Sequence, residues 1–330
     1  MAGWRFMRPV GRHTGALSLL LLLISLPVES ADFSLVVSPQ RSATEATLMG
    51  IHFLDARNGW AVGAGGTGLK TTDGGKKWKK VTTGTRVTLT SVFFLDRQRG
   101  WVTGTAGMLR RTMNGGESWV LVPLDTQQAL YNVFFSSPKA GWVVGGGGTI
   151  LHTDDGGEHW VEQASGANAA LYAAYFLNER HGTVAGALGT VLVTDDGGAT
   201  WTAQETQGSV TLFDVVFTDA SNGWAVGNAG ALFQTTDGGA HWIDRTLPCG
   251  STCTKLTDLL KVRFPSPREG WIIGERGMLY RTTDAGYSWS DGRSVSKASM
   301  FGLTFPNVNQ GWASGESGAI VSLQPSDSVH

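Results

Sequence analysis

Apolar residues recur along this chain in short runs that polar or Gly-rich segments interrupt. Residues 89–122 show the pattern clearly. Their four apolar runs cover residues 89–95, 100–103, 108–112 and 118–122. Runs this short, with no helical period, are typical of strands bounded by turns. The stretch therefore predicts four short antiparallel strands joined by tight turns.

This four-strand pattern repeats along the chain. A Gly-Trp pair marks each copy, at spacings of 41, 41, 41, 41, 47 and 41 residues, with Gly182-Thr183 in the fourth place. A Phe stands six residues before each pair, and a Leu or Met stands five residues before each Phe. A fixed period of this size, with four strands per period and no helical pattern, is typical of a propeller blade. The sequence therefore predicts an all-β, seven-bladed β-propeller built from four-stranded antiparallel blades.

A second motif separates the third and fourth strands of a copy. It reads TTDGGKKW at 71–78 and recurs five times, ending with TTDAGYSW at 282–289. The Asp or Asn can accept backbone N–H groups, and glycines allow positive φ, so the motif predicts a tight turn. Copies spread around a ring cannot converge on one substrate, and turn formation is favoured over calcium binding. The structural positions are Asp73, Asn114, Asp155, Asp196, Asp237 and Asp284.

The seventh copy lacks this turn and the fourth strand, because the chain ends soon after its third strand at 319–323. Residues 33–39 supply a candidate, since FSLVVSP resembles WVLVP at 119–123, the fourth strand of a complete copy. We expect this N-terminal strand to complete the last blade and close the ring. Closure removes the open edge that a linear array of sheets would expose.

The first 30 residues read as a signal peptide. Arg5, Arg8 and Arg12 precede an apolar run at 17–26, and small residues at Val28 and Ser30 fit cleavage after Ser30. The run is too short to span a bilayer, and an uncleaved anchor is the less favoured alternative. We expect an exported protein of the periplasm or thylakoid lumen, or a secreted one, with a single domain at 31–330. We also expect the mature chain to be monomeric and to lack a membrane span.

Composition and charge narrow the function classes. The 330 residues are 41% hydrophobic and 16% charged, and the net charge of −1 gives no global attraction to nucleic acid or anionic membranes. Cys249 and Cys253 lie in the insertion that lengthens one spacing to 47 residues, and they are disulfide candidates in an oxidising compartment. They lack the His of a haem attachment motif and the second Cys pair of a zinc site. No metal or other cofactor is predicted.

Candidate catalytic groups are scarce. The predicted first strands would line a central channel, and the candidate carboxylates there are Asp214 and Asp258, with Lys261 and Arg263 nearby. The two carboxylates do not form a convincing acid/base pair. A glycosidase needs two carboxyl groups flanking the scissile bond. The other copies carry non-acidic residues at the position of Asp214. A satisfied ion pair is therefore the favoured interpretation, and we expect no enzymatic activity.

Basic residues cluster in the second copy, where Arg97, Arg99, Arg110 and Arg111 are the candidate partner-binding residues. First turns and Asp-Gly-Gly turns should share one face of the ring, so cations there could form an arc. Such an arc suits an acidic protein surface. The alternative is ordinary solvated charge on turns.

The turn motif resembles the Asp-box (BNR) repeat of sialidases. More closely, the whole of residues 32–330 resembles the photosystem II assembly and stability factor family of seven-bladed propellers. The likeness lies in Gly-Trp-x-Val-Gly at 59–63, 141–145 and 223–227 and in the Asp-Gly-Gly-x-x-Trp that follows. The resemblance implies a non-enzymatic, lumenal factor of photosynthesis that binds a membrane-protein subunit through an Arg-rich patch. The alternatives are a glycoside hydrolase or sialidase-like enzyme and a glycan-binding propeller.

Overall fold

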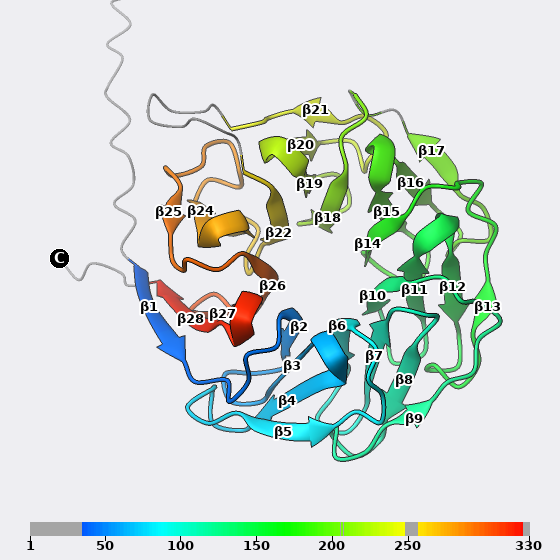
Figure 1. The fold of residues 1–330 in the computed structure, drawn as a ribbon. Helices are drawn as coiled ribbons and strands as arrows, with labels where there is room; N and C mark the ends of the chain where they lie inside the picture. The colour runs from blue at the N-terminus through cyan, green and yellow to red at the C-terminus, as the bar shows by residue number, and fades with distance from the viewer. Residues whose placement is uncertain (1–34, 205, 207, 248–256, 326–330) are drawn as a thin grey trace, which may run out of the picture. The chain divides into compact units, whose positions relative to one another are not determined.

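The computed structural model describes residues 35–204, 206, 208–247 and 257–325. These residues form a ring of seven separate four-stranded sheets, and every strand pairing is antiparallel (Figure 1). The seven-bladed propeller predicted from the sequence is confirmed. The innermost strands surround a central channel, and the outer strands form the rim (Figure 1).

The strands of each blade follow in chain order from the channel to the rim, except in blade 7. The innermost strands are β2 (Leu48–Phe53), β6 (Leu89–Phe94), β10 (Leu130–Phe135), β14 (Leu171–Phe176), β18 (Leu212–Phe217), β22 (Leu259–Arg263) and β26 (Met300–Asn307). The second strands are β3 (Gly59–Gly63), β7 (Gly100–Gly104), β11 (Gly141–Gly145), β15 (Gly182–Gly186), β19 (Gly223–Gly227), β23 (Gly270–Gly274) and β27 (Gln310–Gly315). The third strands are β4 (Thr67–Thr71), β8 (Leu109–Thr112), β12 (Ile150–Thr153), β16 (Val191–Thr194), β20 (Leu232–Thr235), β24 (Met278–Thr282) and β28 (Ile320–Pro325). The outer strands are β5 (Lys79–Thr82), β9 (Val120–Leu121), β13 (Val161–Glu162), β17 (Thr202–Gln204), β21 (Ile243–Asp244), β25 (Arg293–Ser294) and β1 (Leu35–Gln40). We number the blades 1 to 7 in the order of their innermost strands.

The N-terminal strand closes the ring, as predicted. β1 pairs with β28 in antiparallel register, with Val37 opposite Leu323, and it is the outer strand of blade 7. The paired segments are slightly displaced from the expected 33–39 and 319–323. Blade 7 is thus assembled from the two ends of the described chain.

The Gly-rich turns between second and third strands form short 3-10 helices in six blades, a detail that the sequence pattern did not predict. They are η1 (Ala64–Gly66), η2 (Gly146–Gly148), η3 (Ala187–Gly189), η4 (Asn228–Gly230), η5 (Glu275–Gly277) and η6 (Glu316–Gly318). Their middle residue has positive φ, for example 63° at Gly65 and 56° at Leu188. No helix within the described residues is long and apolar enough to cross a membrane.

The hydrophobic core lies mainly between blades. At six of the seven boundaries, a buried Trp from the second strand of one blade stacks on the Phe at or near the end of the innermost strand of the next blade. The stacked pairs are Trp60–Phe94, Trp101–Phe135, Trp142–Phe176, Trp224–Phe264, Trp271–Phe305 and Trp312–Phe53. Burying an aromatic pair of this kind contributes the largest apolar area of any side-chain contact. The boundary between blades 4 and 5 is the exception, because Thr183 stands where the Trp would be.

The glycine of each Gly-Trp pair makes this stacking possible. A Cβ atom on Gly141 would lie 2.5 Å from Phe135 Cε1, and one on Gly100 would lie 2.6 Å from Phe94 Cε1. Any larger residue would push the Phe ring away from the position that the neighbouring Trp contacts. The recurrent Gly and the Phe six residues before it therefore form one packing unit.

The two faces of the ring carry different turns. Gly74 N–H donates to Arg57 O at 2.9 Å, which joins the Asp-Gly-Gly turn of blade 1 to its first turn. Ala64 N–H donates to Thr47 O at 2.9 Å, which joins the second turn to the connection between blades. We call the face with the first turns and Asp-Gly-Gly turns the Asp-box face. This division agrees with the arrangement expected from the sequence.

Candidate functional site

The six Asp-Gly-Gly turns use their side chains internally. Thr71 Oγ1 donates to Asp73 Oδ1 at 2.9 Å and accepts from Gly75 N–H at 2.9 Å, while Asp73 Oδ1 also accepts from Lys77 N–H at 2.9 Å. The same Thr-to-Asp or Thr-to-Asn hydrogen bond occurs at the five other positions, Asn114, Asp155, Asp196, Asp237 and Asp284. These carboxylates fix the turn backbone. Within the described ranges, no three His, Cys, Asp or Glu residues are grouped as a metal site would need.

Hydrogen bonding stabilises the charged form of these Asp side chains. The His241 N–H donates to Asp237 Oδ1 at 2.9 Å and lowers the pKa of Asp237 to about 2, with help from the His241 ring and the Thr235 hydroxyl. At Asp155 the His159 N–H has the same effect and holds the pKa well below its usual range. Both carboxylates are therefore ionised at neutral pH and committed to their own turns.

The structure does not gather the four candidate arginines into one cluster. Arg97 pairs with Asp55 at 2.9 Å, and Arg99 pairs with Asp96 at 2.7 Å, both on first turns of the Asp-box face. Arg110 and Arg111 are neighbours on β8, so they point to opposite sides of the sheet. Arg110 and Arg111 therefore cannot both belong to one patch with Arg97 and Arg99.

Arg110 and Arg111 contact different neighbours. Arg111 forms an ion pair with Glu158 in the Asp-Gly-Gly turn of blade 3. Arg110 Nη1 donates to Trp119 O at 3.1 Å, and a Cβ on Gly84 would lie 2.7 Å from it, on the side of blade 1. Lys70 repeats the Arg111 contact one blade earlier, with Glu117 at 2.8 Å. These inter-blade ion pairs are structural contacts that sequence proximity alone could not indicate.

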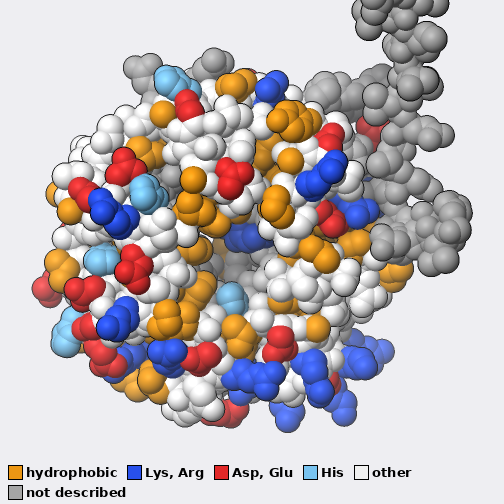
Figure 2. All heavy atoms as spheres, turned by 180° about the vertical axis from the view of Figure 1, so that it is seen from behind, with side chains coloured by type: hydrophobic (Ala, Val, Ile, Leu, Met, Phe, Trp, Pro, Cys, Tyr) orange, Lys and Arg blue, Asp and Glu red, His pale blue; other side chains and the backbone are white. Residues whose placement is uncertain are grey.

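A basic sector remains on the Asp-box face at blades 1 and 2. We define it as Arg57, Lys76, Lys77, Arg97 and Arg99, which lie on first turns or on the Asp-Gly-Gly turn. Within the part of the chain that the structure describes, Arg57, Lys76 and Lys77 form no ion pair. Figure 2 shows Lys and Arg side chains gathered at the lower right of the view, with acidic side chains among them. The Lys-rich copy of the turn motif, GGKKWKK, is the sequence signal for this sector.

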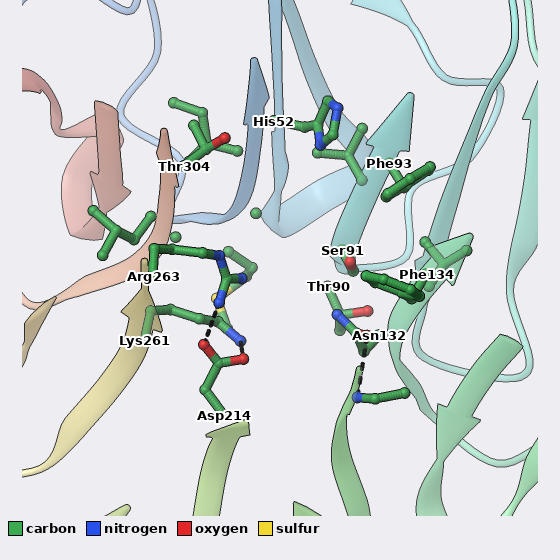
Figure 3. Close-up of a pocket in the computed structure, with 18 of the residues that line it drawn as sticks. His52, Thr90, Ser91, Phe93, Asn132, Phe134, Asp214, Lys261, Arg263 and Thr304 are labelled. Carbon is green, nitrogen blue, oxygen red and sulfur yellow. Dashed lines mark hydrogen bonds and ion pairs between the residues drawn. The ribbon is translucent and has the colours of Figure 1, made fainter. Parts of the chain in front are cut away.

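The channel triad consists of Asp214 on β18 and of Lys261 and Arg263 on β22. Asp214 is buried, with its Oδ1 3.4 Å from Lys261 Nζ and its Oδ2 2.5 Å from Arg263 Nη1 (Figure 3). Val262 N–H also donates to Oδ2 at 3.0 Å. Burial lowers the pKa of Lys261, and the nearby Asp214 charge opposes that effect. The triad ties blade 5 to blade 6 and leaves no carboxylate oxygen without a partner.

The triad lines a central cavity of about 300 Å³ together with aromatic and polar side chains (Figure 3). His52 is in this lining, and burial lowers its pKa to about 4, so it is neutral at pH 7. Asp214 is the one acidic residue among the described residues that line the cavity. Two-carboxylate hydrolysis therefore has no second group here.

The comparisons with known proteins complete this description. The family model for the photosynthesis system II assembly factor YCF48 matches residues 34–130, 117–202 and 201–296. The chain belongs to this family. The sequence-based recognition is thereby confirmed.

Solved structures agree on the fold of this YCF48-family chain. A structure described as YCF48 bound to D1 peptide has a TM-score of 0.74 and 21% identity, covering 92% of this chain and 100% of the other. The structure of YCF48 from Cyanidioschyzon merolae has a TM-score of 0.71 and 21% identity, covering 88% of this chain and 98% of the other. The structure of virginiamycin B lyase from Staphylococcus aureus has a TM-score of 0.76 and 13% identity, covering 88% of this chain and 99% of the other. Identities this low show a shared fold only, and the comparison with curated proteins finds no match.

Two features of this YCF48-family chain depart from its own internal repeat. Cys249 and Cys253, the disulfide candidates, lie outside the described residues. Thr183 leaves a cavity of about 600 Å³ between blades 4 and 5, which sequence reasoning missed although the absent Trp was visible. The signal that could have found it is the one broken Gly-Trp pair.

Proposed function

We propose that this chain is an exported, non-enzymatic protein-binding factor that helps to assemble a membrane-protein complex. Its family membership supports this proposal, as does the similar solved structure of YCF48 bound to D1 peptide. In this proposal the partner is an acidic, extended segment of a membrane subunit. The chain acts as a monomeric ring in the periplasm or lumen after removal of residues 1–30.

The observation that carries the proposal is the basic sector on the Asp-box face. Arg57, Lys76 and Lys77 are exposed cations with no ion-pair partner among the described residues. Arg97 and Arg99 extend the sector. Their carboxylate partners Asp55 and Asp96 are partly exposed, so the two arginines can exchange these partners for a ligand carboxylate. Charges arranged in this way attract an acidic segment and set its orientation more than they set its raw affinity.

The geometry gives little support to the enzymatic alternatives. Asp214 is already bound by two cations and one backbone N–H, so it is not available as an acid, a base or a nucleophile. The glycan-binding alternative needs exposed aromatic faces. The six Trp residues of the Gly-Trp pairs are at most 2% exposed. Their rings serve packing between blades and cannot stack on a sugar.

A matched pair of arginines tests the proposal. Arg57 and Arg180 occupy the same place in the first turns of blades 1 and 4, and each donates its Nε–H to a turn carbonyl, Thr72 O at 3.4 Å and Asp195 O at 3.2 Å. Their local structure is the same, and only Arg57 lies in the basic sector. The probe is a synthetic acidic peptide, titrated into the full chain at low and at physiological salt.

We expect Arg57→Gln combined with Lys76→Gln to weaken peptide binding about fivefold at low salt, since each exposed charge contributes about 0.2–1 kcal/mol. The weakening should shrink as salt rises. Arg180→Gln should leave the affinity unchanged. Replacing Arg97 and Arg99 tests the sequence-based assignment in the same assay. Equal losses in the Arg57 and Arg180 variants, or no binding of the acidic peptide to the unmodified chain, would contradict the proposal.

A further inference from the structure

The boundary between blades 4 and 5 contains a cavity where the other six boundaries contain an indole ring. Its volume is about 600 Å³. We call it the open slot and define it by Thr183, Val193, Gln204, Phe217 and Gly238, all of which line it. The slot opens on the Asp-box face, because its lining also includes residues of the first turn of blade 4 and of the Asp-Gly-Gly turn of blade 5.

One wall of the open slot is the Phe217 ring, which stacks on Tyr175 at 6.0 Å between centroids, as Phe176 stacks on Phe134 at 6.4 Å, but has no Trp from the second strand of the preceding blade. Phe217 keeps the edge contact with the Asp-box Trp242 at 6.1 Å between ring centroids, as Phe176 keeps its contact with Trp201 at 6.0 Å. Phe176 is also stacked against Trp142 at 3.5 Å. Within the described residues, no ring from the second strand of blade 4 takes that place on Phe217, and Phe217 is 8% exposed against 2% for Phe176.

The residue opposite Thr183 and the turn glycine occupy the same positions as their counterparts at a filled boundary. Val193 lies across from Thr183 in the strand register, as His152 lies across from Trp142. A Cβ on Gly239 would lie 3.2 Å from Val193 Cγ1 and 3.5 Å from Phe217 Cζ. Val193 and Phe217, which both line the slot, therefore lie beside Gly239, the chain neighbour of the lining residue Gly238.

The open slot also keeps the acceptor that an indole N–H uses elsewhere. Trp142 Nε1–H donates to Gly197 O at 3.2 Å, and Trp60 Nε1–H donates to Gly115 O at 3.0 Å. Gly238 holds the equivalent position in blade 5, and its turn lines the slot. An indole in the slot would thus meet both a stacking face and a carbonyl acceptor.

Gln204 adds a second polar group at the outer end. Its equivalent one blade earlier, Gln163, donates from Nε2 to Gly197 O at 2.9 Å and accepts from Trp201 Nε1–H at 3.3 Å. Trp242, the counterpart of Trp201, instead donates to Gly239 O at 3.0 Å. Within the described residues the Gln204 amide forms no hydrogen bond, and Gln204 lines the slot, where its amide can act as a donor and an acceptor.

We propose that the open slot binds an indole group, supplied by a tryptophan side chain of a partner polypeptide or by a small indole compound. The indole stacks on Phe217 and donates its N–H to Gly238 O, as Trp60, Trp142 and Trp312 donate to the equivalent carbonyls at three filled boundaries. This site goes beyond the proposed function. It lies at blades 4 and 5, away from the basic sector of blades 1 and 2, so either assignment can fail without the other.

The test titrates free indole and N-acetyl-tryptophanamide into the full chain and follows binding by NMR chemical shifts. We expect both ligands to bind in the millimolar range or more tightly. The amide binds more tightly if the natural source is a tryptophan side chain, and less tightly if the source is a free indole compound. 1-Methylindole should bind about fivefold more weakly than indole, because it cannot donate the hydrogen bond.

Thr183→Trp supplies the missing ring from the chain itself and should abolish binding of both ligands. Thr183→Val keeps the cavity and should bind like the unmodified chain. Should Thr183→Trp fail to fold, Phe217→Leu removes the stacking face and should weaken binding at least severalfold. Failure of both ligands to bind the unmodified chain, or equal binding to the Thr183→Trp and unmodified chains, would overturn the proposal.

Discussion

The boundary between blades 3 and 4 and the boundary between blades 4 and 5 are built from the same repeat but differ at the Trp of the Gly-Trp pair. Trp142 fills the first boundary and stacks on Phe176 at 3.5 Å, whereas Thr183 leaves the second with a cavity of about 600 Å³. Turn glycines, the edge-on Trp and the Phe are present at both. In a repeat protein, residues that recur in every copy serve to pack neighbouring repeats together. A copy that lacks such a residue therefore does not use that position for packing.

The largest expected effect comes from opening the filled boundary. We expect Trp142→Ala to lower the free energy of unfolding by about 3–5 kcal/mol, because it removes a fully buried aromatic side chain and leaves a cavity. Denaturant-induced unfolding followed by circular dichroism measures the change. Thr183→Ala is the matched control and should cost less than about 1 kcal/mol. Similar costs for the two variants would show that the boundaries do not differ energetically.

Filling the open boundary is the converse experiment. We expect Thr183→Trp to raise the free energy of unfolding by about 0.5–2 kcal/mol, as cavity-filling substitutions commonly do. The new ring has the Phe217 face and the Gly238 carbonyl available, as Trp142 has Phe176 and Gly197. The denaturation midpoint measures the gain. A lower midpoint would mean that the walls of the slot have moved too close to accept an indole.

The smallest effect concerns a second pair of unlike copies, Asp237 in blade 5 and Asn114 in blade 2. Hydrogen bonds lower the pKa of Asp237 to about 2, below the unfolded value of about 3.9. Its stabilisation is therefore complete above about pH 4 and is lost as the pH falls through about 2. Asp237→Asn should therefore make the free energy of unfolding fall less steeply as the pH drops from about 4 to about 2, the range that we call the acid limb.

Asn114 already makes the same turn contacts with Thr112 and Ser118 through a neutral side chain. Asn114→Asp should therefore steepen the loss of stability between about pH 4 and pH 2. Free energies of unfolding measured across this range check both variants. Identical acid limbs in the two variants and the unmodified chain would show that these carboxylates do not contribute to acid unfolding.

The fold could be predicted because each repeat position has a strong physical reason. A tight turn needs glycines at positive φ, and stacking between blades needs a Gly beneath each Phe ring, so both leave a fixed period in the sequence. Strand ends were less predictable. The expected fourth strand at 118–122 is Val120–Leu121 in the structure, because Asn114 Oδ1 accepts the Ser118 N–H and holds that residue in the turn.

The candidate site was only partly predictable, because it depends on contacts between distant residues. Arg111 and Glu158 meet across a blade boundary, and their sequences give no sign of that pairing before the register is known. Grouping Arg110 with Arg111 was misleading, since adjacent strand residues face opposite ways. The change at Thr183 was visible in the sequence. The pocket that results could not be predicted, because two of the residues that line it, Val193 and Phe217, come from different blades.

The pairing of β1 with β28 has a consequence for the order in which the molecule can form. Ser38 and Ser322 meet in this pair although 284 residues separate them along the chain. Blades 1 to 6 use only local connections and can assemble as the chain emerges during synthesis. Blade 7 must wait for its third strand, so β1 stays unpaired until β28 (Ile320–Pro325) has been made. A partially synthesised ring therefore exposes two strand edges, and completion of the last blade is the step at which the molecule becomes resistant to association with its own copies.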